Sequence, residues 1–456
     1  MVNVKKIIKI IVIVSFCILA FALAQYHEPW SDEAQSFLIA RDTTLSELFG
    51  VMKYEGTPPL WVLLIKLFLF MGGTYETFFL VSLIPTIIGI IIFELKVKAP
   101  IYIKILFPFT YFIFYQNTIV SRSYCLVFPA LMLLALIYEK RFEKPIIYSL
   151  VLLFIMGISL HMLVIAGSLY LIFLIDIIKE KKYKSTKIIL SIIIIFVELL
   201  IATIWTFPAS DCSFGGNGGR PLYYIISEAT IGSNMGIILE IMVSCAICSM
   251  LFLVLMKDSL LDIIKFLILV FPVIIVLNII TYQGWHVGII WLVLFTYFII
   301  KDKINNDNLI KTFVVIVCIM QLYWTINTSI YEINHKYSAS EDVANFIKEL
   351  DYENLEIYGL GYYVTGIQPY FEKNIFDNYC TDKAYKIWKF DNGYLSDEET
   401  INDNADVYIV SKFGVSQEIV SQIELKENYD KYEFNGYTYI KDKVFEPEAF
   451  WIYVKK

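Results

Sequence analysis

The sequence predicts an all-α bundle of membrane-spanning helices, followed by a small α/β domain at its C-terminal end. Hydrophobic residues make up 58% of the 456 positions and charged residues only 18%. Long apolar runs recur with short polar gaps, and a soluble protein of this size could not cover so much apolar surface. The last part differs, because residues 330–456 carry 24 acidic and 13 basic side chains. We therefore assign residues 1–329 to a transmembrane module and residues 330–456 to a soluble domain.

Eleven apolar runs predict full crossings of the membrane. They are residues 7–24, 77–94, 101–117, 124–138, 145–160, 162–178, 188–207, 236–256, 264–281, 286–300 and 309–328. The first run ends in Ala22-Leu23-Ala24, which resembles the cleavage site of a signal peptide. Its 18-residue length and the many helices that follow favour a retained anchor.

The basic residues predict the orientation of these spans. With a cytoplasmic N-terminus, the lysine clusters before residue 330 fall in cytoplasmic loops, and the outside loops hold only Arg41, Lys53, Arg122 and Arg220. Cytoplasmic loops carry the excess of basic residues in membrane proteins. We therefore expect a multi-pass protein of the cell membrane whose C-terminal domain is extracytoplasmic.

The segment after the first span predicts an unusual external surface. Residues 25–57 form the first external loop, and residues 33–50 within it predict one amphipathic helix lying on the membrane. Residues 58–71 are apolar, but they are only 14 residues long and contain Lys66. A full crossing there would also place the later lysine clusters outside. We predict a re-entrant or interfacial segment; twelve spans is the alternative.

The acidic tail predicts a small α/β domain. Its expected elements are a helix over residues 341–350 capped by Ser340, strands over residues 355–359 and 406–411, and a hairpin at Asn435-Gly436 between YEF and YTYI. No catalytic constellation is evident in this part of the sequence. We expect the domain to support or shape a substrate site.

Polar residues from distant loops converge on the predicted outer surface. An adjacent Asp32-Glu33 pair follows the first span, at a bilayer surface where acidic side chains are costly. Two carboxylates that face arginine and histidine side chains indicate a site that deprotonates one substrate and holds an anion on the other, the carboxylates serving as the base and the cationic side chains as the anion's partners. The candidate site residues in this group are Asp32, Glu33, Glu55, Arg122, His161, Arg220 and His286.

The sequence also excludes several chemistries. It contains no GxxxxGK[ST] motif, no GxGxxG after a strand, no Asp-x-Asp pair and no basic nucleic-acid footprint. The seven cysteines lack metal-binding spacing. The Gly-rich residues 212–221 are either an outer loop that closes over substrate or a slack connection. Group transfer outside the membrane must then use a donor already activated and carried across, such as a sugar on a polyprenyl phosphate.

Three stretches resemble the C-type membrane glycosyltransferases. They are WSDEAQSF followed by YEGTPPLW, SRSYCLVFPALMLLALIYEKR, and GWHVGIIWLVLF. The chain is most similar to the bacterial branch of the dolichyl-phosphate-mannose–protein mannosyltransferase and aminoarabinose transferase group, over residues 1–330. This resemblance implies an inverting transferase that uses a polyprenyl-phosphate sugar on the outer face of the membrane.

The resemblance further implies roles for individual residues. Asp32 matches the family's catalytic aspartate, which takes the proton from the acceptor hydroxyl. Glu33 would orient the acceptor or assist a divalent cation. Arg122, together with His286 and His161, would neutralise the departing phosphate, a task that suits the bidentate guanidinium.

The chain departs from the family at one motif. The family's His-Pro-Pro-Leu is replaced by Thr57-Pro58-Pro59-Leu60. Thr57 can hydrogen-bond a sugar or a phosphate but carries no charge. The identity of the sugar and of the acceptor, and the participation of a metal, therefore stay open.

Two other functions remain alternatives. Glu198 and Glu240 lie inside apolar runs, and intramembrane acids usually face a cavity or a partner. A membrane transporter or lipid flippase would use them as a proton or ion pathway, although a structural hydrogen bond explains them equally well. A scaffold protein of the cell envelope would fit the tail domain but leaves the Asp32-Glu33 pair unexplained.

Overall fold

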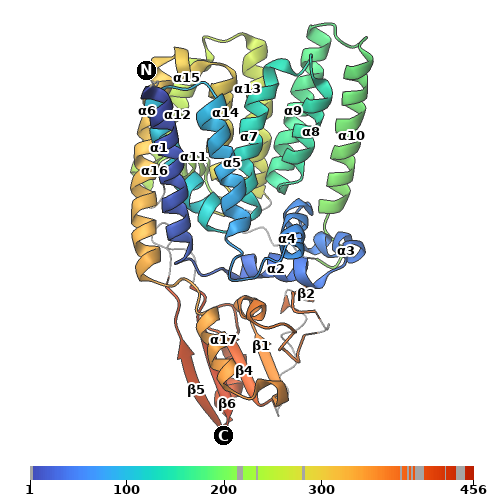
Figure 1. Ribbon diagram of the computed structural model, residues 1–456, viewed down its shortest axis with the longest axis vertical. Helices are drawn as coiled ribbons and strands as arrows, with labels where there is room; N and C mark the ends of the chain where they lie inside the picture. Colours follow the sequence, from blue (N-terminus) through green and yellow to red (C-terminus); the bar gives the residue numbers. More distant parts are fainter. Residues whose placement is uncertain are drawn as a thin grey trace.

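The computed structural model shows a helical bundle with a small domain attached to one end (Figure 1). It describes residues 4–212, 219–232, 235–279, 283–379, 383–387, 390–391, 394–395, 405–426, 428–437 and 447–456. The chain is mostly helical, and its only sheets within these residues belong to the C-terminal part. The expected division into a helical module and a small C-terminal sheet domain is confirmed at this level.

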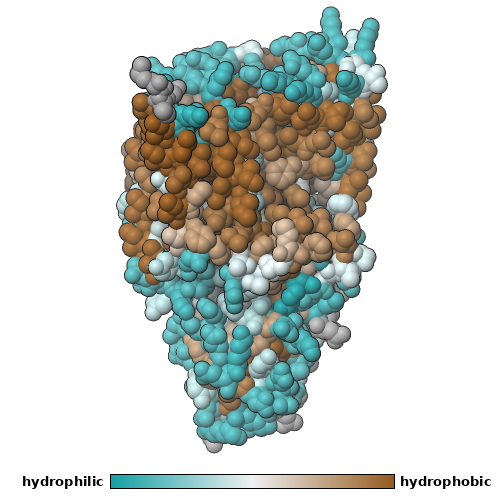
Figure 2. Space-filling view, in the orientation of Figure 1, coloured by the Kyte–Doolittle hydropathy of each residue, from teal (hydrophilic) through white to brown (hydrophobic). Residues whose placement is uncertain are grey.

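Within the described residues, seven helical segments are long and apolar enough to cross a membrane. They are α1 (Val4–Ala24), Ser123–Lys140 with α7 (Val127–Ile137) at its centre, α9 (Leu160–Lys179), α10 (Thr186–Thr206), α12 (Ile237–Leu255), α13 (Leu260–Ile279) and α16 (Asn308–Asn334). A broad hydrophobic band covers the bundle, with hydrophilic surface at both ends (Figure 2). Exposing an apolar surface of this extent to water is energetically unfavourable, so the protein belongs in a membrane.

Shorter elements fill the remaining predicted spans. They are α5 (Leu80–Lys96), α8 (Pro145–Met156) and α14 (Gly288–Ile300). Two further short helices, α11 (Leu222–Thr230) and α15 (Lys303–Asn306), lie between longer helices in the sequence. The expected helix over residues 101–117 is broken into α6 (Ile101–Leu106), a 3₁₀ turn at Phe107–Phe109 and the π-helix η2 (Phe112–Ile119). Pro108 lacks an amide hydrogen, which favours the break.

The expected single helix over residues 33–50 is two helices. They are α2 (Ser31–Asp42) and α3 (Leu45–Glu55), separated at Thr43-Thr44. Thr44 ends the continuity because it caps α3: its hydroxyl accepts a hydrogen bond from the Glu47 amide (3.3 Å), and the Glu47 carboxylate accepts one from the Thr44 amide (2.7 Å).

The segment predicted to be re-entrant is α4 (Leu60–Phe70), whose 11 residues are too short to span a bilayer. It packs against α2, and its Lys66 ammonium donates to the Ala40 carbonyl at 2.7 Å. Helices α2, α3 and α4 form a layer between the bundle and the C-terminal domain (Figure 1).

The C-terminal domain contains a four-stranded sheet in the order β1-β4-β6-β5. The strands are β1 (Ile357–Leu360), β4 (Val407–Ser411), β5 (Tyr429–Phe434) and β6 (Phe450–Lys455); β1 runs parallel to β4, and the other pairs are antiparallel. The domain also contains two helices, α17 (Ser340–Glu349) and α18 (Gln417–Glu424). A separate antiparallel pair of strands is formed by β2 (Phe390–Asp391) and β3 (Tyr394–Leu395). Every residue of β4 is buried, so this strand is the centre of the domain.

Two local expectations for this domain need correction. Ser340 is the first helical residue of α17 and not its cap, because the chain turns one residue earlier, at Ala339. The strand before Asn435-Gly436 pairs with β6, whose residues 450–455 lie well beyond the expected partner. Tyr437 is outside any strand, and the rest of the expected return strand falls outside the described residues.

Candidate functional site

The structure pairs Asp32 with Arg122. Asp32 lies in the first turn of α2, where the helix dipole favours a carboxylate. Arg122 is in extended backbone just before the 3₁₀ helix η3 (Ser123–Leu126), and its Nη1 lies 2.7 Å from Asp32 Oδ2. The Asp32 side chain is 43% exposed, whereas that of Arg122 is 21% exposed. Burial opposes the charge on Arg122, but the Asp32 carboxylate, together with weaker contributions from Tyr124, Glu33 and Glu55, outweighs it and raises the pKa of Arg122.

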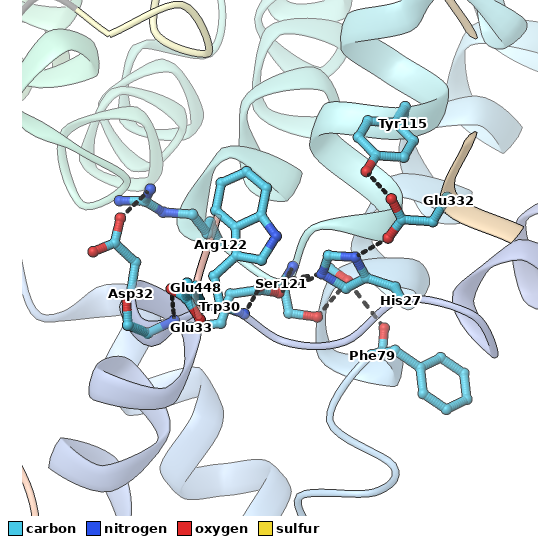
Figure 3. A network of polar contacts seen from close by, with 12 residues as sticks. His27, Trp30, Asp32, Glu33, Phe79, Tyr115, Ser121, Arg122, Glu332 and Glu448 are labelled. Atoms are coloured by element: carbon cyan, nitrogen blue, oxygen red, sulfur yellow. Dashed lines mark hydrogen bonds and ion pairs between the residues drawn. The ribbon is translucent and has the colours of Figure 1, made fainter. Parts of the chain in front are cut away.

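Glu33, the neighbour of Asp32, is completely buried and bonded within the protein (Figure 3). Its carboxylate accepts hydrogen bonds from the backbone amides of Trp30, at 2.8 Å, and Ser121. Ser121 directly precedes Arg122, so this one carboxylate ties the start of α2 to the backbone that carries the arginine. This geometry suits a positioning role, while the expected contact of Glu33 with an acceptor or metal would require this arrangement to open.

A buried histidine extends this arrangement towards the bundle (Figure 3). His27 lies between two carboxylates: its Nε2 is 3.0 Å from Glu33 Oε2, and its Nδ1 is 2.7 Å from Glu332 Oε1. Glu332 belongs to the last turn of α16 and also accepts a 2.6 Å hydrogen bond from the Tyr115 hydroxyl on η2. Burial opposes protonation of His27, but the two glutamates outweigh it and raise the pKa of His27 well above its ordinary value of 6.5.

The raised pKa of His27 predicts that the protein loses stability as the pH rises. A folded-state pKa above the unfolded value means that the contribution of His27 is complete below pH 6.5 and disappears as the pH passes through the folded pKa. Thermal unfolding in nanodiscs at increasing pH should therefore show wild type approaching a His27→Gln variant above pH 6.5. A constant difference between the two proteins over this range would contradict the charged state of His27.

Two acidic groups need to be separated from this effect. Burial raises the pKa of Glu28 and of Glu448 to about 7, from an ordinary value of 4.5. The contribution of each group to stability is also lost as the pH rises, between its ordinary pKa of 4.5 and its raised pKa of about 7. This loss falls mostly below the pH range in which His27 titrates. Both groups are present in wild type and in His27→Gln, but the charge of His27 lowers the pKa of Glu28, so the difference between the two proteins reports His27 together with its effect on Glu28.

A second part of the site consists of two histidines and the aromatic rings of Tyr124 and Trp285. The rings of His161, on α9, and His286, before α14, have centroids 4.5 Å apart. His286 contacts the Tyr124 ring at 5.4 Å, and the Arg122 guanidinium lies 5.3 Å from the Trp285 ring. Within the described part of the chain, both buried ring nitrogens of His161 lack a hydrogen-bond partner. Four of the residues proposed from the sequence, Asp32, Arg122, His161 and His286, therefore lie in one continuous group.

The other residues proposed from the sequence are Glu55, Thr57 and Arg220. Glu55, at the end of α3, accepts a 2.8 Å hydrogen bond from the Gln35 side chain of α2, and its charge favours the charged form of Arg122. Thr57 is half-buried between α3 and α4. Arg220 is exposed over the Tyr224 ring of α11, and its carbonyl accepts from Asn278 at 3.0 Å. Residues 213–218 of the Gly-rich loop lie outside the described residues.

The two intramembrane acids occupy different parts of the bundle. Glu240 is buried at the start of α12 and accepts a 3.2 Å hydrogen bond from the Met235 amide. Glu198 lies in the middle of α10, and its Oε2 is buried without a partner among the residues described. Helix α10 packs on α8 and α9, whereas α12 packs on α11 and α16. The two side chains therefore do not line a shared path between neighbouring helices.

A groove of about 940 Å³ opens where α3 meets the end of α10. Ile204 and Phe207 line it on the bundle side, and Tyr385 and Ile387 of the C-terminal domain line it on the other. Ile204 and Phe207 are also exposed on the surface of the bundle, so the groove continues the apolar outer face of α10 into the layer of α2 and α3.

The candidate metal site receives no support from clustering. Across the residues that the structure describes, no three His, Cys, Asp or Glu side chains are gathered so that they could hold a metal ion. The cation nearest to Asp32 is the guanidinium of Arg122. The divalent cation considered from the sequence stays a prediction.

Sequence reasoning missed several residues that support the site. Glu332 follows the last predicted span, and Glu448 lies more than 400 positions after α2, so neither has a local signal that connects it to Asp32. His27 follows the first span closely in the sequence, but nothing local indicates that its ring joins Glu33 to Glu332. Such contacts depend on how the distant helices pack.

Comparisons with known proteins returned no relatives. No family model, no curated protein and no solved structure matches this chain. Inferences about its function therefore rest on the residues and the geometry of the site.

Proposed function

We propose that the protein is an integral membrane glycosyltransferase that moves a sugar from a polyprenyl-phosphate donor to an extracytoplasmic acceptor. The observation that carries this proposal is the half-exposed Asp32 carboxylate held against Arg122, beside His286 and His161. Asp32 belongs to α2, in the layer of helices at one end of the bundle (Figure 1), and Arg122 pairs with it from the backbone before η3. The resemblance of the WSDEAQSF segment to the C-type glycosyltransferases agrees with this chemistry.

The proposal includes a topology with eleven spans and one re-entrant segment, α4. The N-terminus would be cytoplasmic, and the layer of α2, α3 and α4 would be extracytoplasmic together with the C-terminal domain. The start of α1 lies at the end of the bundle opposite to that domain (Figure 1), which agrees with this orientation. The distribution of lysines between the loops supports it independently.

The reaction is a single in-line displacement at the anomeric carbon of the sugar. The acceptor oxygen forms a bond to that carbon while its proton passes to the Asp32 carboxylate. The bond from the anomeric carbon to the phosphate oxygen breaks, and its electron pair leaves with the polyprenyl phosphate. The anomeric configuration is inverted. Asp32 needs to be positioned close to the acceptor hydroxyl, because its proton transfer accompanies bond formation.

Arg122 would stabilise the charge that the phosphate gains as it leaves. In the structure, Asp32 Oδ2 contacts Nη1 of this guanidinium, and we propose that the donor phosphate replaces Asp32 at this nitrogen. The replacement frees the carboxylate to act as the base. The Trp285 and Tyr124 rings beside Arg122 offer apolar faces for a sugar ring, and His161 and His286 lie behind them. The groove along α10 gives a polyprenyl chain an apolar path to this layer.

An Arg122→Lys variant is expected to bind the donor about tenfold more weakly, because lysine keeps the charge but loses the bidentate fork. The measurement is the donor dissociation constant in nanodiscs. Arg141→Lys is the matched control, since Arg141 also pairs with an aspartate, Asp176 at 2.8 Å, but on the cytoplasmic side of the proposed topology. Equal donor affinities for wild type and Arg122→Lys would contradict the assignment of the phosphate to Arg122.

The function is tested with purified protein in nanodiscs, offered a panel of polyprenyl-phosphate sugars and a mixed pool of acceptors. Mass spectrometry would follow the release of free polyprenyl phosphate. Release that depends on one sugar and one class of acceptor supports the proposal and identifies both substrates. If no donor is bound or consumed, transport through Glu198 or Glu240 becomes the favoured alternative.

A further inference from the structure

A glutamate of the C-terminal domain reaches the start of the helix that carries Asp32. Glu448 is buried, and its Oε1 accepts a 2.8 Å hydrogen bond from the backbone amide of Ser31. Ser31 is the first residue of α2 and directly precedes Asp32. The first amides of a helix have no partner within the helix, so a carboxylate placed there completes the first turn.

The domain holds Glu448 in a fixed place. Its backbone forms a β-bridge with Ser338, and its carbonyl accepts a 2.9 Å hydrogen bond from the Ala339 amide. Gly366 leaves room for the Ser340 hydroxyl beside Glu448: a β-carbon at this position would be 2.5 Å from Ser340 Oγ, whereas Glu448 Oε2 would be at an ordinary contact distance of 3.5 Å. These backbone contacts hold Glu448 where its carboxylate meets the start of α2.

The same domain contacts α2 along its whole length. In the middle, the Gln35 side chain donates to the Lys386 carbonyl at 2.7 Å and accepts from the Lys386 amide at 3.0 Å. Near the end, Arg41 donates to the Phe371 carbonyl at 2.7 Å, and Lys383 donates to the Asp42 carbonyl at 2.7 Å. The opposite side of α2 packs on α4, so the helix is enclosed between the bundle and the domain.

We propose that Glu448 is a positioning residue for Asp32, which makes the C-terminal domain a working part of the transfer site. This inference rests on the proposed transferase function. Glu33 and Glu448 divide the task at the start of α2: Glu33 accepts from the Trp30 amide and links α2 to Ser121, and Glu448 accepts from the Ser31 amide. Loss of the Glu448 bond frees the first turn, and Asp32 moves relative to Arg122 and to the acceptor.

The environment of Glu448 agrees with such a role. Burial raises its pKa to about 7, hydrogen bonds from Ser31 and Ser338 oppose the shift, and the charge of Asp32 adds to it. Its carboxyl group is thus in electrostatic contact with the proposed base across the interface between the two domains.

The inference is tested in the full-length protein in nanodiscs with three substitutions. Glu448→Ala removes the acceptor for the Ser31 amide, and we expect kcat to fall about tenfold while the donor dissociation constant changes less than about twofold. Glu448→Gln keeps a carbonyl oxygen for that amide and should retain most of the activity. Glu418→Ala, at an exposed position on α18 of the same domain, is the matched control.

Ser31→Pro tests the same bond from its other side. Proline removes the donated amide hydrogen, suits the first position of a helix, and follows Trp30, whose extended backbone accepts a proline after it. It should lower kcat as Glu448→Ala does. The double variant should be little worse than Glu448→Ala alone, because both substitutions remove the hydrogen bond between Ser31 and Glu448.

Hydrogen exchange of α2 provides a readout that does not depend on catalysis. Glu448→Ala and Ser31→Pro should accelerate exchange in the first turn of α2, and Glu448→Gln and Glu418→Ala should not. Wild-type exchange together with wild-type kcat in Glu448→Ala would overturn the inference, as would a loss of donor binding equal to the loss of kcat. If wild type consumes no donor, the transferase proposal fails, and the exchange data alone decide whether Glu448 holds α2.

Discussion

Replacing Asp32 with asparagine is expected to lower the rate of donor consumption by about 10³-fold, because general-base catalysis typically contributes about 10²- to 10⁴-fold. Donor binding should be unchanged or tighter, since the uncharged asparagine competes less strongly than aspartate with the phosphate for Arg122. The measurement combines the single-turnover rate with the donor dissociation constant in nanodiscs. A loss of rate without a loss of binding separates a base from a residue that merely holds substrate.

The control for this substitution is Asp211→Asn. Asp211 is an exposed carboxylate that accepts a hydrogen bond from the Tyr54 hydroxyl at 3.0 Å, so it shares the surface but not the contact with Arg122. Its substitution should leave the rate close to that of wild type. Turnover by Asp32→Asn within a few-fold of wild type would remove Asp32 from the role of base.

Replacing Glu33 with alanine is expected to lower the free energy of unfolding by about 3–5 kcal/mol, the usual cost of removing one partner of a buried ion pair. The substitution leaves the His27 cation and the amides of Trp30 and Ser121 without their shared acceptor. Equilibrium unfolding in detergent micelles would measure the loss. Glu33→Gln should cost less, because its carbonyl oxygen still accepts from one of the amides.

A double variant makes this prediction more specific. In His27→Gln/Glu33→Gln, the cation is removed along with its partner, so part of the stability lost in Glu33→Gln should return. A different result for Glu33→Ala would change the role assigned to Glu33. A Glu33→Ala protein with wild-type stability but no activity would assign Glu33 to contact with a substrate or metal, the role that the family resemblance implies.

Much of the arrangement could be predicted from the sequence because hydropathy and charge act locally. Apolar runs identified the membrane module, and the acidic tail identified the separate domain. The candidate residues Asp32, Arg122, His161 and His286 were grouped because loops on one side of a bundle meet at one end. The structure places these four together although they come from distant parts of the chain.

Other features depended on information that the local sequence does not carry. The amphipathic pattern across residues 33–50 continues through Thr43-Thr44, and only the capping of α3 by Thr44 reveals the break. The partners of His27 and Ser31 are Glu332 and Glu448, which reach the site through the packing of α16 and the docking of the C-terminal domain. Long-range contacts of this kind are set by the tertiary structure.

The most direct measurement follows a polyprenyl-phosphate sugar, labelled in both the sugar and the lipid, in proteoliposomes that contain the protein and an acceptor pool. A transferase breaks the bond between sugar and phosphate, so the two labels should separate into a glycosylated acceptor and free polyprenyl phosphate. The separation should be lost in Asp32→Asn. If both labels stay together on an intact lipid that only changes leaflet, the protein moves the lipid and does not transfer the sugar.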